Sequence, residues 1–271
     1  MKQTKTNRRE ALKKLAGLAG AVAVAPKTTG AEEALRRYLF KNGVGEDYDP
    51  FDHKWLMVID IERCIGCGMC VRACKAENEV PRDPLHFRTW VEQYTIKKAD
   101  VATGRIEGET IVRSPNGGYD GFPPPEVPEE EILRSFFVPK LCNLCHHSPC
   151  SQVCPVGATF DTPDGAVLVD YEYCMGCGFC VQACPYGCRY MHPERHTADK
   201  CTLCYHRITR GLKPACVEVC PTQARIFGDL KHLGPDDPLR TFIETKKAQS
   251  LKPHLGTEPR VLYAGLDKEV R

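Results

Sequence analysis

The chain has 271 residues, a length that suits one large domain or two small ones. Its 37 Lys and Arg nearly balance 35 Asp and Glu, and a net charge of +2 argues against a nucleic-acid binder held by phosphate contacts. The 17 cysteines are too sparse for a short disulfide scaffold, and their odd number excludes a complete set of disulfides. The longest apolar run, 15–25, is far shorter than the roughly 20 residues of a membrane-spanning helix, so we expect no permanent span.

The first 31 residues are typical of an export signal. Adjacent Arg8 and Arg9 precede the short apolar run, as in a twin-arginine (Tat) signal, although Ala11 stands where such signals usually have Phe. The small residues at 21–25 offer cleavage sites, and an uncut segment could instead serve as an anchor. A basic amphipathic helix without a targeting role is the alternative. The sequence thus predicts a signal segment at 1–31, followed by a linker at 32–53.

Sixteen of the cysteines fall into four groups of four with short spacings. The first and third groups have the spacing C-x2-C-x2-C-x3-C, the second C-x2-C-x4-C-x3-C and the fourth C-x2-C-x11-C-x3-C. In two-cluster ferredoxins such a run places three cysteines on one cluster and the fourth on its neighbour. The groups are Cys64, Cys67, Cys70 and Cys74; Cys142, Cys145, Cys150 and Cys154; Cys174, Cys177, Cys180 and Cys184; and Cys201, Cys204, Cys216 and Cys220.

The residues between and after the cysteines favour iron–sulfur chemistry. Proline follows the fourth cysteine in three groups and should end a short helix there, whereas Lys75 takes this place in the first group. Gly66, Gly68, Gly176 and Gly178 lie between ligands, where the backbone must curl around a cluster. Only the fourth group, taken alone, resembles a zinc site, and such closely spaced cysteines rarely form disulfides. We therefore expect four [4Fe-4S] clusters held by all sixteen cysteines.

Five other residues near the groups are candidates for supporting roles. Cys188 stands outside the groups and is expected to be a small buried core residue rather than a ligand. His146 and His147 lie inside the second group, whose cysteines already suffice, so surface or supporting roles are expected. Lys140 and Lys200 each precede a ligand run, where a cation could raise a cluster potential; both could equally be ordinary surface lysines.

Around the cysteine groups the sequence predicts an α+β fold built from repeats of strand, ligand loop, short helix and strand. Apolar and β-branched runs predict strands before or after three groups, and Asp164-Gly165 predicts a hairpin turn. The expected strands are 54–60, 166–170 and 225–228, and the expected short helices lie near 71–77 and 179–183.

Two segments without cysteine lie outside these repeats. Residues 85–138 form a β-rich insertion with a proline-rich stretch at 121–125 and an acidic run at 129–131. This insertion is either a surface loop or a docking surface for a partner subunit. The C-terminal tail, 229–271, looks extended and either wraps a neighbour or packs on its own domain.

The order of the four groups, the wide spacing inside the last and the Tat-like start resemble the four-cluster ferredoxin-like subunits of membrane-bound respiratory complexes. These include electron-transfer subunits of dimethyl sulfoxide, polysulfide, tetrathionate and cytochrome-linked nitrite reductase systems and of formate dehydrogenases. The resemblance covers roughly residues 54–263. It implies two pseudo-symmetric bacterial-ferredoxin-like modules, each holding two [4Fe-4S] clusters. Module one would comprise 54–84 and 197–228, and module two 139–196.

The resemblance also implies crossed ligation, in which the fourth cysteine of each group serves its partner's cluster. Cluster one would be held by Cys64, Cys67, Cys70 and Cys220, and cluster two by Cys142, Cys145, Cys150 and Cys184. Cluster three would be held by Cys174, Cys177, Cys180 and Cys154, and cluster four by Cys201, Cys204, Cys216 and Cys74.

The function implied by the resemblance is electron transfer, with no catalytic residue of the chain's own. The partners would be a quinone-reactive integral-membrane subunit and either a molybdopterin catalytic subunit or a multihaem cytochrome. After Tat export the chain would lie peripherally on the periplasmic or extracytoplasmic face of the cytoplasmic membrane. One alternative is a quinone–cytochrome complex of sulfate or sulfite respiration without a molybdopterin partner. A self-contained reductase or a structural metal protein would be of another class, but the sequence offers no nucleotide loop, nucleophile–base motif or further ligand set.

Overall fold

The computed structural model describes residues 30–41, 44, 48–83, 85–99, 105–116, 127–245 and 248–270. Most of the predicted signal segment, 1–29, and the proline-rich stretch lie outside these residues. Helix α2 (Gly30–Lys41) begins at the end of the predicted signal segment and continues into the range predicted as a linker, which also contains the 3-10 turn η1 (Pro50–Asp52). Within the described ranges, no helix combines the length and the apolar character that crossing a membrane requires.

A three-stranded sheet joins the first cysteine group to the fourth. Its central strand β1 (Trp55–Asp60) pairs antiparallel with β9 (Arg225–Asp229) and parallel with β10 (Val261–Ala264). Every residue of β1 is buried, and the run of large apolar residues suits a strand covered on both faces. The predicted strands at 54–60 and 225–228 are confirmed. Their pairing brings together the two groups that are farthest apart in the sequence.

The helices after the ligand loops pack in pairs. Helix α3 (Met69–Glu77) contacts α7 (Ala215–Glu218), and α4 (Pro149–Gln152) contacts α5 (Phe179–Gln182). A fifth short helix, α6 (Tyr205–Ile208), follows the second cysteine of the fourth group. Helices α4, α5 and α7 each end two residues before a Cys-Pro pair, whereas α3 continues past Cys74 to Glu77. The predicted effect of proline is therefore confirmed.

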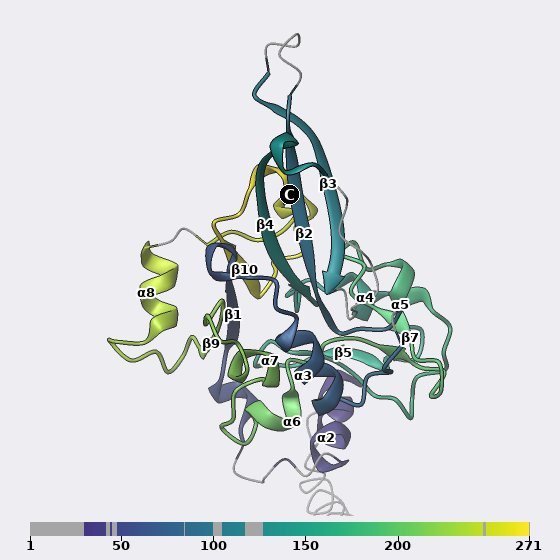
Figure 1. Cartoon of the computed structure of the whole chain (residues 1–271). Helices are drawn as coiled ribbons and strands as arrows, with labels where there is room; N and C mark the ends of the chain where they lie inside the picture. Colours follow the sequence, from purple (N-terminus) through teal and green to yellow (C-terminus); the bar gives the residue numbers. More distant parts are fainter. Residues whose placement is uncertain are drawn as a thin grey trace, which may run out of the picture.

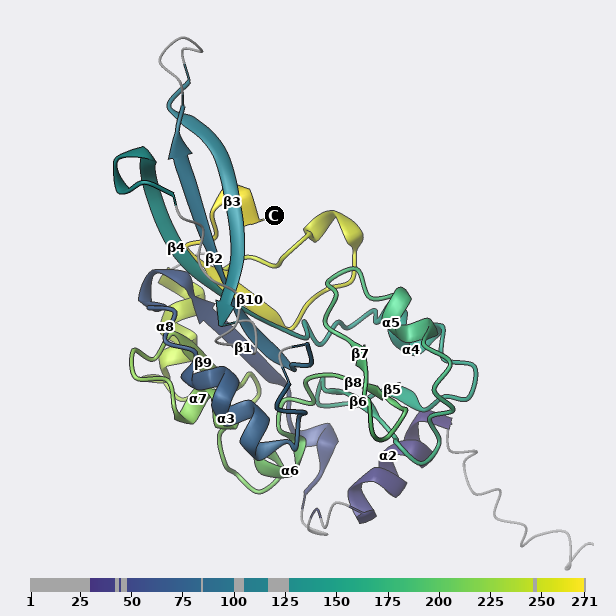
Figure 2. The same ribbon diagram turned by 45° about the vertical axis from the view of Figure 1, so that its right-hand side comes forward.

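Two short hairpins lie beside α4 and α5. Strand β5 (Thr159–Asp161) pairs with β6 (Val167–Val169), and β7 (Tyr190–Met191) pairs with β8 (Ala198–Asp199). The predicted turn at Asp164-Gly165 joins β5 to β6, and Gly165 has a φ of +95°, which glycine adopts readily. Figure 2 shows α3, α7, β1 and β9 on one side of the molecule and α4, α5 and β5–β8 on the other.

The insertion forms a separate sheet of three long strands, in the order β3-β2-β4. These are β2 (Thr89–Lys98), β3 (Glu107–Asn116) and β4 (Ile132–Leu141), preceded by the exposed acidic turn η4 (Glu129–Glu131). The sheet extends away from the cysteine-containing part of the molecule (Figure 1). Because β4 ends one residue before Cys142, it also fixes where the second group begins.

The C-terminal tail packs on its own chain. It contains α8 (Pro238–Thr245), the turns η5 (Pro253–Leu255) and η6 (Lys268–Val270), and strand β10. In Figure 2 the last part of the tail, drawn in yellow, runs between the insertion sheet and the two cysteine-containing sides, whereas α8 lies beside β9. One continuous core includes residues from both of these sides, and a smaller apolar cluster lies under α8.

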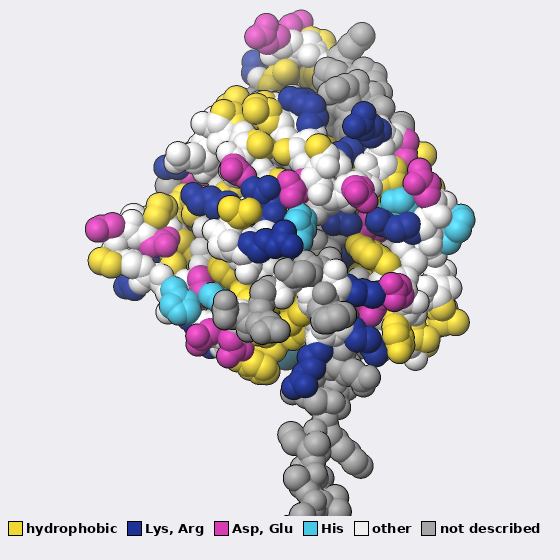
Figure 3. Space-filling model, turned by 90° about the horizontal axis from the view of Figure 1, so that it is seen from below, with side chains coloured by type: hydrophobic (Ala, Val, Ile, Leu, Met, Phe, Trp, Pro, Cys, Tyr) yellow, Lys and Arg dark blue, Asp and Glu magenta, His cyan; other side chains and the backbone are white. Residues whose placement is uncertain are grey.

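Charged side chains of both signs are mixed over the face of the molecule shown in Figure 3. This mixture agrees with the nearly balanced composition of the chain. The face therefore lacks the single-sign field that would steer a nucleic acid.

Candidate iron–sulfur centres

Cysteines of the first and fourth groups line a shared cavity. Cys64, Cys67, Cys70 and Cys220 surround an empty volume of about 340 Å³, with Arg225 also at its wall. The first three come from the loop before α3 and from its first turn, and Cys220 follows α7. The packing of α3 on α7 and the pairing of β1 with β9 thus bring together the four residues expected around cluster one.

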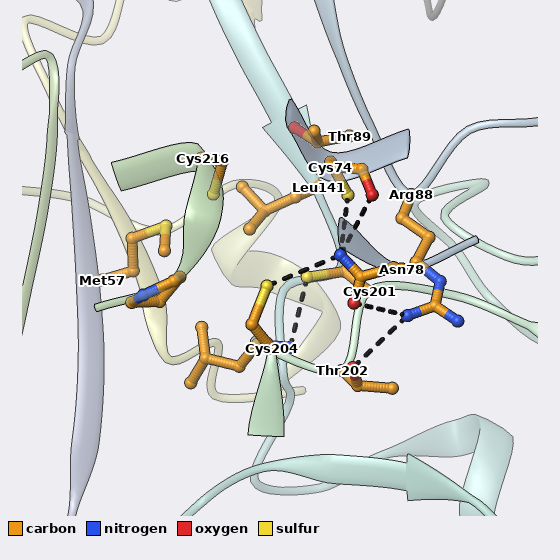
Figure 4. A pocket seen from close by; sticks show the side chains of 12 residues that line it. Met57, Cys74, Asn78, Arg88, Thr89, Leu141, Cys201, Thr202, Cys204 and Cys216 are labelled. Atoms are coloured by element: carbon orange, nitrogen blue, oxygen red, sulfur yellow. Dashed lines mark hydrogen bonds between the residues drawn. The ribbon is translucent and has the colours of Figure 1, made fainter. Parts of the chain in front are cut away.

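A second cavity contains the complementary set. Cys74, Cys201, Cys204 and Cys216 line an empty volume of about 290 Å³, and their side chains surround it (Figure 4). All four are buried. Burial raises the pKa of Cys201 to about 12 and that of Cys216 to about 11. Buried neutral thiols of this kind become favourable thiolates when a metal ion takes the place of their protons.

The structure also gathers the residues expected around cluster two. Burial, together with the adjacent Cys142, Cys150 and Cys184 thiols, raises the pKa of Cys145 to about 12. For the last set, Cys154 follows α4 while Cys180 lies on α5, and these two helices are in contact. Three of the four expected sets therefore converge in space, and two members of the last set lie on or directly after two helices that are in contact.

The surroundings of the cysteine sulfurs are rich in hydrogen-bond donors. The backbone N–H groups of Thr159, Ala198 and Leu203 each donate to a cysteine Sγ at 3.4 Å. The Asn78 side-chain nitrogen lies 3.6 Å from both Cys74 Sγ and Cys204 Sγ, as Figure 4 shows. Donors of this kind stabilise anionic sulfur, so the donor set fits four-thiolate coordination of [4Fe-4S] clusters.

Three buried cations lie near these cysteines. Arg189, Arg225 and Lys200 are 6%, 3% and 0% exposed, and among the described residues none has a carboxylate within ion-pair distance. Arg88, in contrast, is paired with buried Asp199 at 2.9 Å. Burying a lone cation is costly, so the anionic charge of a cluster and its thiolates would complete the site. The surface alternative for Lys200 is wrong, since its Nζ donates to the Val167 and Cys201 carbonyl oxygens inside the protein.

The ligand loops share one backbone feature that the sequence shows only in part. The residue before the second cysteine of each group has a positive φ: 68° at Gly66, 47° at Leu144, 74° at Gly176 and 59° at Leu203. We predicted this need from the glycines alone and missed the two leucines. Aligning the four Cys-x-x-Cys starts would have identified them, because Leu144 and Leu203 stand where the other groups have glycine.

The supporting residues have different environments. Cys188 is buried as predicted, and its thiol lies 3.0 Å from the Leu141 carbonyl oxygen. A hydrogen bond from Cys188 also lowers the pKa of the Cys184 thiol to about 5. His146 is exposed, with its Nδ1 3.0 Å from Arg260 Nη2, and His147 is exposed as well. Lys140 is mostly buried, 3.6 Å from the Glu92 carboxylate, and burial lowers its pKa.

Comparison with known proteins identifies the same chemistry. Residues 63–158 and 133–230 match profiles of the 4Fe-4S dicluster domain. The chain is 42% identical over 217 residues to the B subunit of tetrathionate reductase from Salmonella typhimurium, an alignment that covers 79% of this chain and 74% of that one. It is 40% identical to the corresponding B subunit from Archaeoglobus fulgidus, covering 85% and 87% of the two chains.

A third relative, protein NrfC of Escherichia coli, is 36% identical over 76% of this chain and 78% of its own length. The resemblance expected from the cysteine spacing is thereby confirmed. The chain belongs to the family of 4Fe-4S dicluster ferredoxin-like proteins that serve as iron–sulfur electron-transfer subunits of oxidoreductase complexes, related to the B subunits of tetrathionate and dimethyl sulfoxide reductases and to protein NrfC.

Proposed function

We propose that this chain carries electrons through four [4Fe-4S] clusters between a quinone-reactive membrane subunit and a molybdopterin or haem subunit of a respiratory complex. The observation that carries the proposal is the convergence of cysteines from distant groups on shared, largely buried cavities. When bound, such clusters accept and release single electrons. The chain's own residues hold the ligands, exclude water and supply donors to sulfur.

The exposure of the cysteines supports an order of one, four, two, three along the relay. Cys67 and Cys177, assigned to clusters one and three, are exposed, whereas all four cysteines assigned to cluster four are buried. Cys201 of the cluster-four set lies near Cys142 of the cluster-two set. Burial is the main cause that raises the pKa of Cys201, and the Cys216 and Cys142 thiols are close enough to raise it as well. The two ends of the relay would therefore face partners, and its middle would stay dry.

The exposed cysteines are bordered by exposed apolar side chains. Ile65 is 60% exposed and Met69 40% exposed beside Cys67, while Met175 is 66% exposed and Phe179 54% exposed beside Cys177. Apolar side chains of this kind are commonly covered in a complex. Their position supports one partner at each end of the relay.

Crossed ligation can be tested with a reciprocal pair of variants. Cys74→Ser should change the EPR signal of the cluster held by Cys201, Cys204 and Cys216. Cys220→Ser should instead change the signal of the cluster held by Cys64, Cys67 and Cys70. Loss of the cluster of the mutated group itself in either variant would contradict the assignment.

The metal content separates the proposal from the other classes of function. A four-cluster relay should hold about sixteen irons and sixteen acid-labile sulfides per chain. Zinc in their place would indicate a structural metal protein. Reduction of a terminal acceptor by the purified chain without partners would indicate a self-contained reductase.

We also propose export by the Tat route and a peripheral position on the outer face of the cytoplasmic membrane. The support is the Arg8-Arg9 pair before a short apolar run. Replacing both arginines by lysine should leave the cluster-loaded protein in the cytoplasmic fraction. The membrane subunit and the catalytic or haem subunit should co-purify with the exported wild-type protein.

A further inference from the structure

Two buried arginines occupy equivalent places in the sequence. Arg189 stands five residues after Cys184, and Arg225 stands five residues after Cys220, each with a proline directly after the cysteine. The corresponding positions after Cys74 and Cys154 are Glu79 and Thr159. Only the third and fourth groups, one in each proposed module, therefore carry this arginine.

Arg225 bridges the cysteines of two groups. Its Nη2 lies 3.5 Å from Cys70 Sγ and its Nη1 lies 3.6 Å from Cys216 Sγ. Cys70 belongs to the set of cluster one, and Cys216 to that of cluster four. Nη2 also donates to Thr89 Oγ1 at 2.7 Å, which fixes the orientation of the guanidinium plane. One cation thus lies between the two cluster sites of its module.

Arg189 makes the matching contacts on the other side of the molecule. Its Nη2 donates to Cys150 Sγ at 3.1 Å, and its Nη1 donates to Thr159 Oγ1 at 3.2 Å. The Cys180 thiol, of the cluster-three set, also lies within electrostatic range of this guanidinium. Both arginines therefore contact the third cysteine of a group and a buried threonine hydroxyl.

Within the described part of the chain, these two cations are not paired with a carboxylate. Both are more than nine-tenths buried, and no carboxylate among the described residues is within ion-pair distance of either. Electrostatic interactions are strong in such a dry environment, and a cation favours whichever state of its neighbour carries more negative charge. For an iron–sulfur cluster that state is the reduced one.

We propose that Arg189 and Arg225 are paired positioning residues, each of which raises the reduction potentials of the two clusters of its own module by lying between their cysteine ligands. The inference rests on the proposed four-cluster relay and its crossed ligation. In each module, one equivalent arginine supplies the positive charge that shifts the potentials of the two clusters in that module and not those of the other module. A cation shared by two neighbouring clusters shifts both of their reduction potentials in the same direction.

The test is an EPR-monitored redox titration of the cluster-loaded protein with Arg189→Gln and Arg225→Gln. Arg225→Gln should lower the potentials of clusters one and four and leave clusters two and three unchanged; Arg189→Gln should do the reverse. We expect at least a tenfold change in the reduction equilibrium of each affected cluster, about 59 mV for a one-electron couple. Arg225→Lys and Arg189→Lys retain the charge and should restore most of the potential. Arg240→Gln, which alters an exposed arginine on α8 that donates to the Leu233 carbonyl oxygen, is the control.

The possible results separate the two proposals. Wild-type protein without four redox-active clusters would overturn the proposed function itself. Four clusters whose potentials ignore both glutamine variants, or shift together in both modules, would overturn the inference alone. If the glutamine variants lose iron, loss confined to the two clusters of one module and prevented by lysine supports the inference, whereas loss from the opposite module or from all four clusters contradicts it.

Discussion

The ligand loops show how single residues carry the geometry of the site. In all four groups the residue before the second cysteine has a positive φ, which costs an ordinary L-residue roughly 1–2 kcal/mol. Gly66 and Gly176 avoid this cost. Leu144 and Leu203 do not, but each is only 1% exposed, so burial of the leucine side chain offsets the strain. Sequence reasoning can find this position from the glycines, but packing decides where a leucine can replace them.

Two glycines with nearly the same φ separate backbone strain from steric clash. Gly66 and Gly178 have φ values of 68° and 77°. A Cβ at Gly66 would lie 2.5 Å from the Phe137 ring, whereas none of the surrounding atoms would be within 4 Å of a Cβ at Gly178. Gly178→Ala should therefore reduce the free energy of unfolding by about 1–2 kcal/mol, and Gly66→Ala should reduce it clearly more. Thermal unfolding of the cluster-loaded proteins can be monitored at one scan rate through the bleaching of the cluster absorbance. The unfolding midpoints then rank the two variants by stability, and equal midpoints would contradict the role of Phe137.

The seventeenth cysteine should be dispensable for metal binding. Cys188 is 4% exposed and lies among core residues, with its thiol near the Leu141 carbonyl oxygen and the Cys184 thiol. Cys188→Ala should keep about sixteen irons per chain, whereas Cys184→Ser should lose cluster two or alter its EPR signal. Iron and sulfide analysis of both variants is the measurement. A fall of about four irons in Cys188→Ala would show that this cysteine is a ligand after all.

At the scale of elements, local signals predicted the short helices and the strands beside the cysteines. Proline after the fourth cysteine ends three helices, and Lys75 lets α3 run on to Glu77. Long-range pairings left no such local signal. Nothing in 229–271 indicates that β10 would pair in parallel with β1, because that contact depends on the surface that β1 offers once folded. Helix α2 was likewise missed, since its range reads as a polar linker.

The pairing of β10 with β1 makes the tail part of the core. Val261 is fully buried and lies opposite Met57. Val261→Ala removes apolar contact from both strands and should cost about 2 kcal/mol. Leu255→Ala, in the exposed turn η5 of the same tail, is the matched control and should change stability by less than about 0.5 kcal/mol. Comparison of the unfolding midpoints tests the effect; a tail that mainly contacts a partner would give equal values for both isolated proteins.

For the molecule as a whole, the charge balance depends on what the cysteines hold. The formal charge of +2 counts Arg189, Arg225 and Lys200 as ordinary basic residues, yet all three are buried without a carboxylate partner among the described residues. Buried lone cations oppose folding, while the same cations favour binding of anionic clusters. Folding and cluster binding should therefore be coupled. Removal of iron by a chelator should lower the unfolding temperature far more than the loss of a few packing contacts would.

Lys200 allows this coupling to be measured, because the effect of Lys200→Met on stability should change sign between the iron-free and the cluster-loaded protein. The Lys200 ammonium is fully buried, and within the described part of the chain it donates to carbonyl oxygens, so in protein stripped of iron Lys200→Met should increase the stability by about 1–4 kcal/mol. In the loaded protein the ammonium faces the charge of neighbouring clusters, so the same substitution should give no gain or a loss. Circular dichroism on heating, with and without iron, measures both effects.

Lys140→Met is the comparison for this test. The Lys140 ammonium has Glu92 as a partner at 3.6 Å, so its removal leaves a carboxylate behind and should not stabilise the iron-free chain. Lys200→Met that destabilises the iron-free and loaded proteins alike would mean that its hydrogen bonds, rather than its charge, explain its burial. A gain confined to the iron-free protein would show that the interior of this chain is balanced for the clusters it binds.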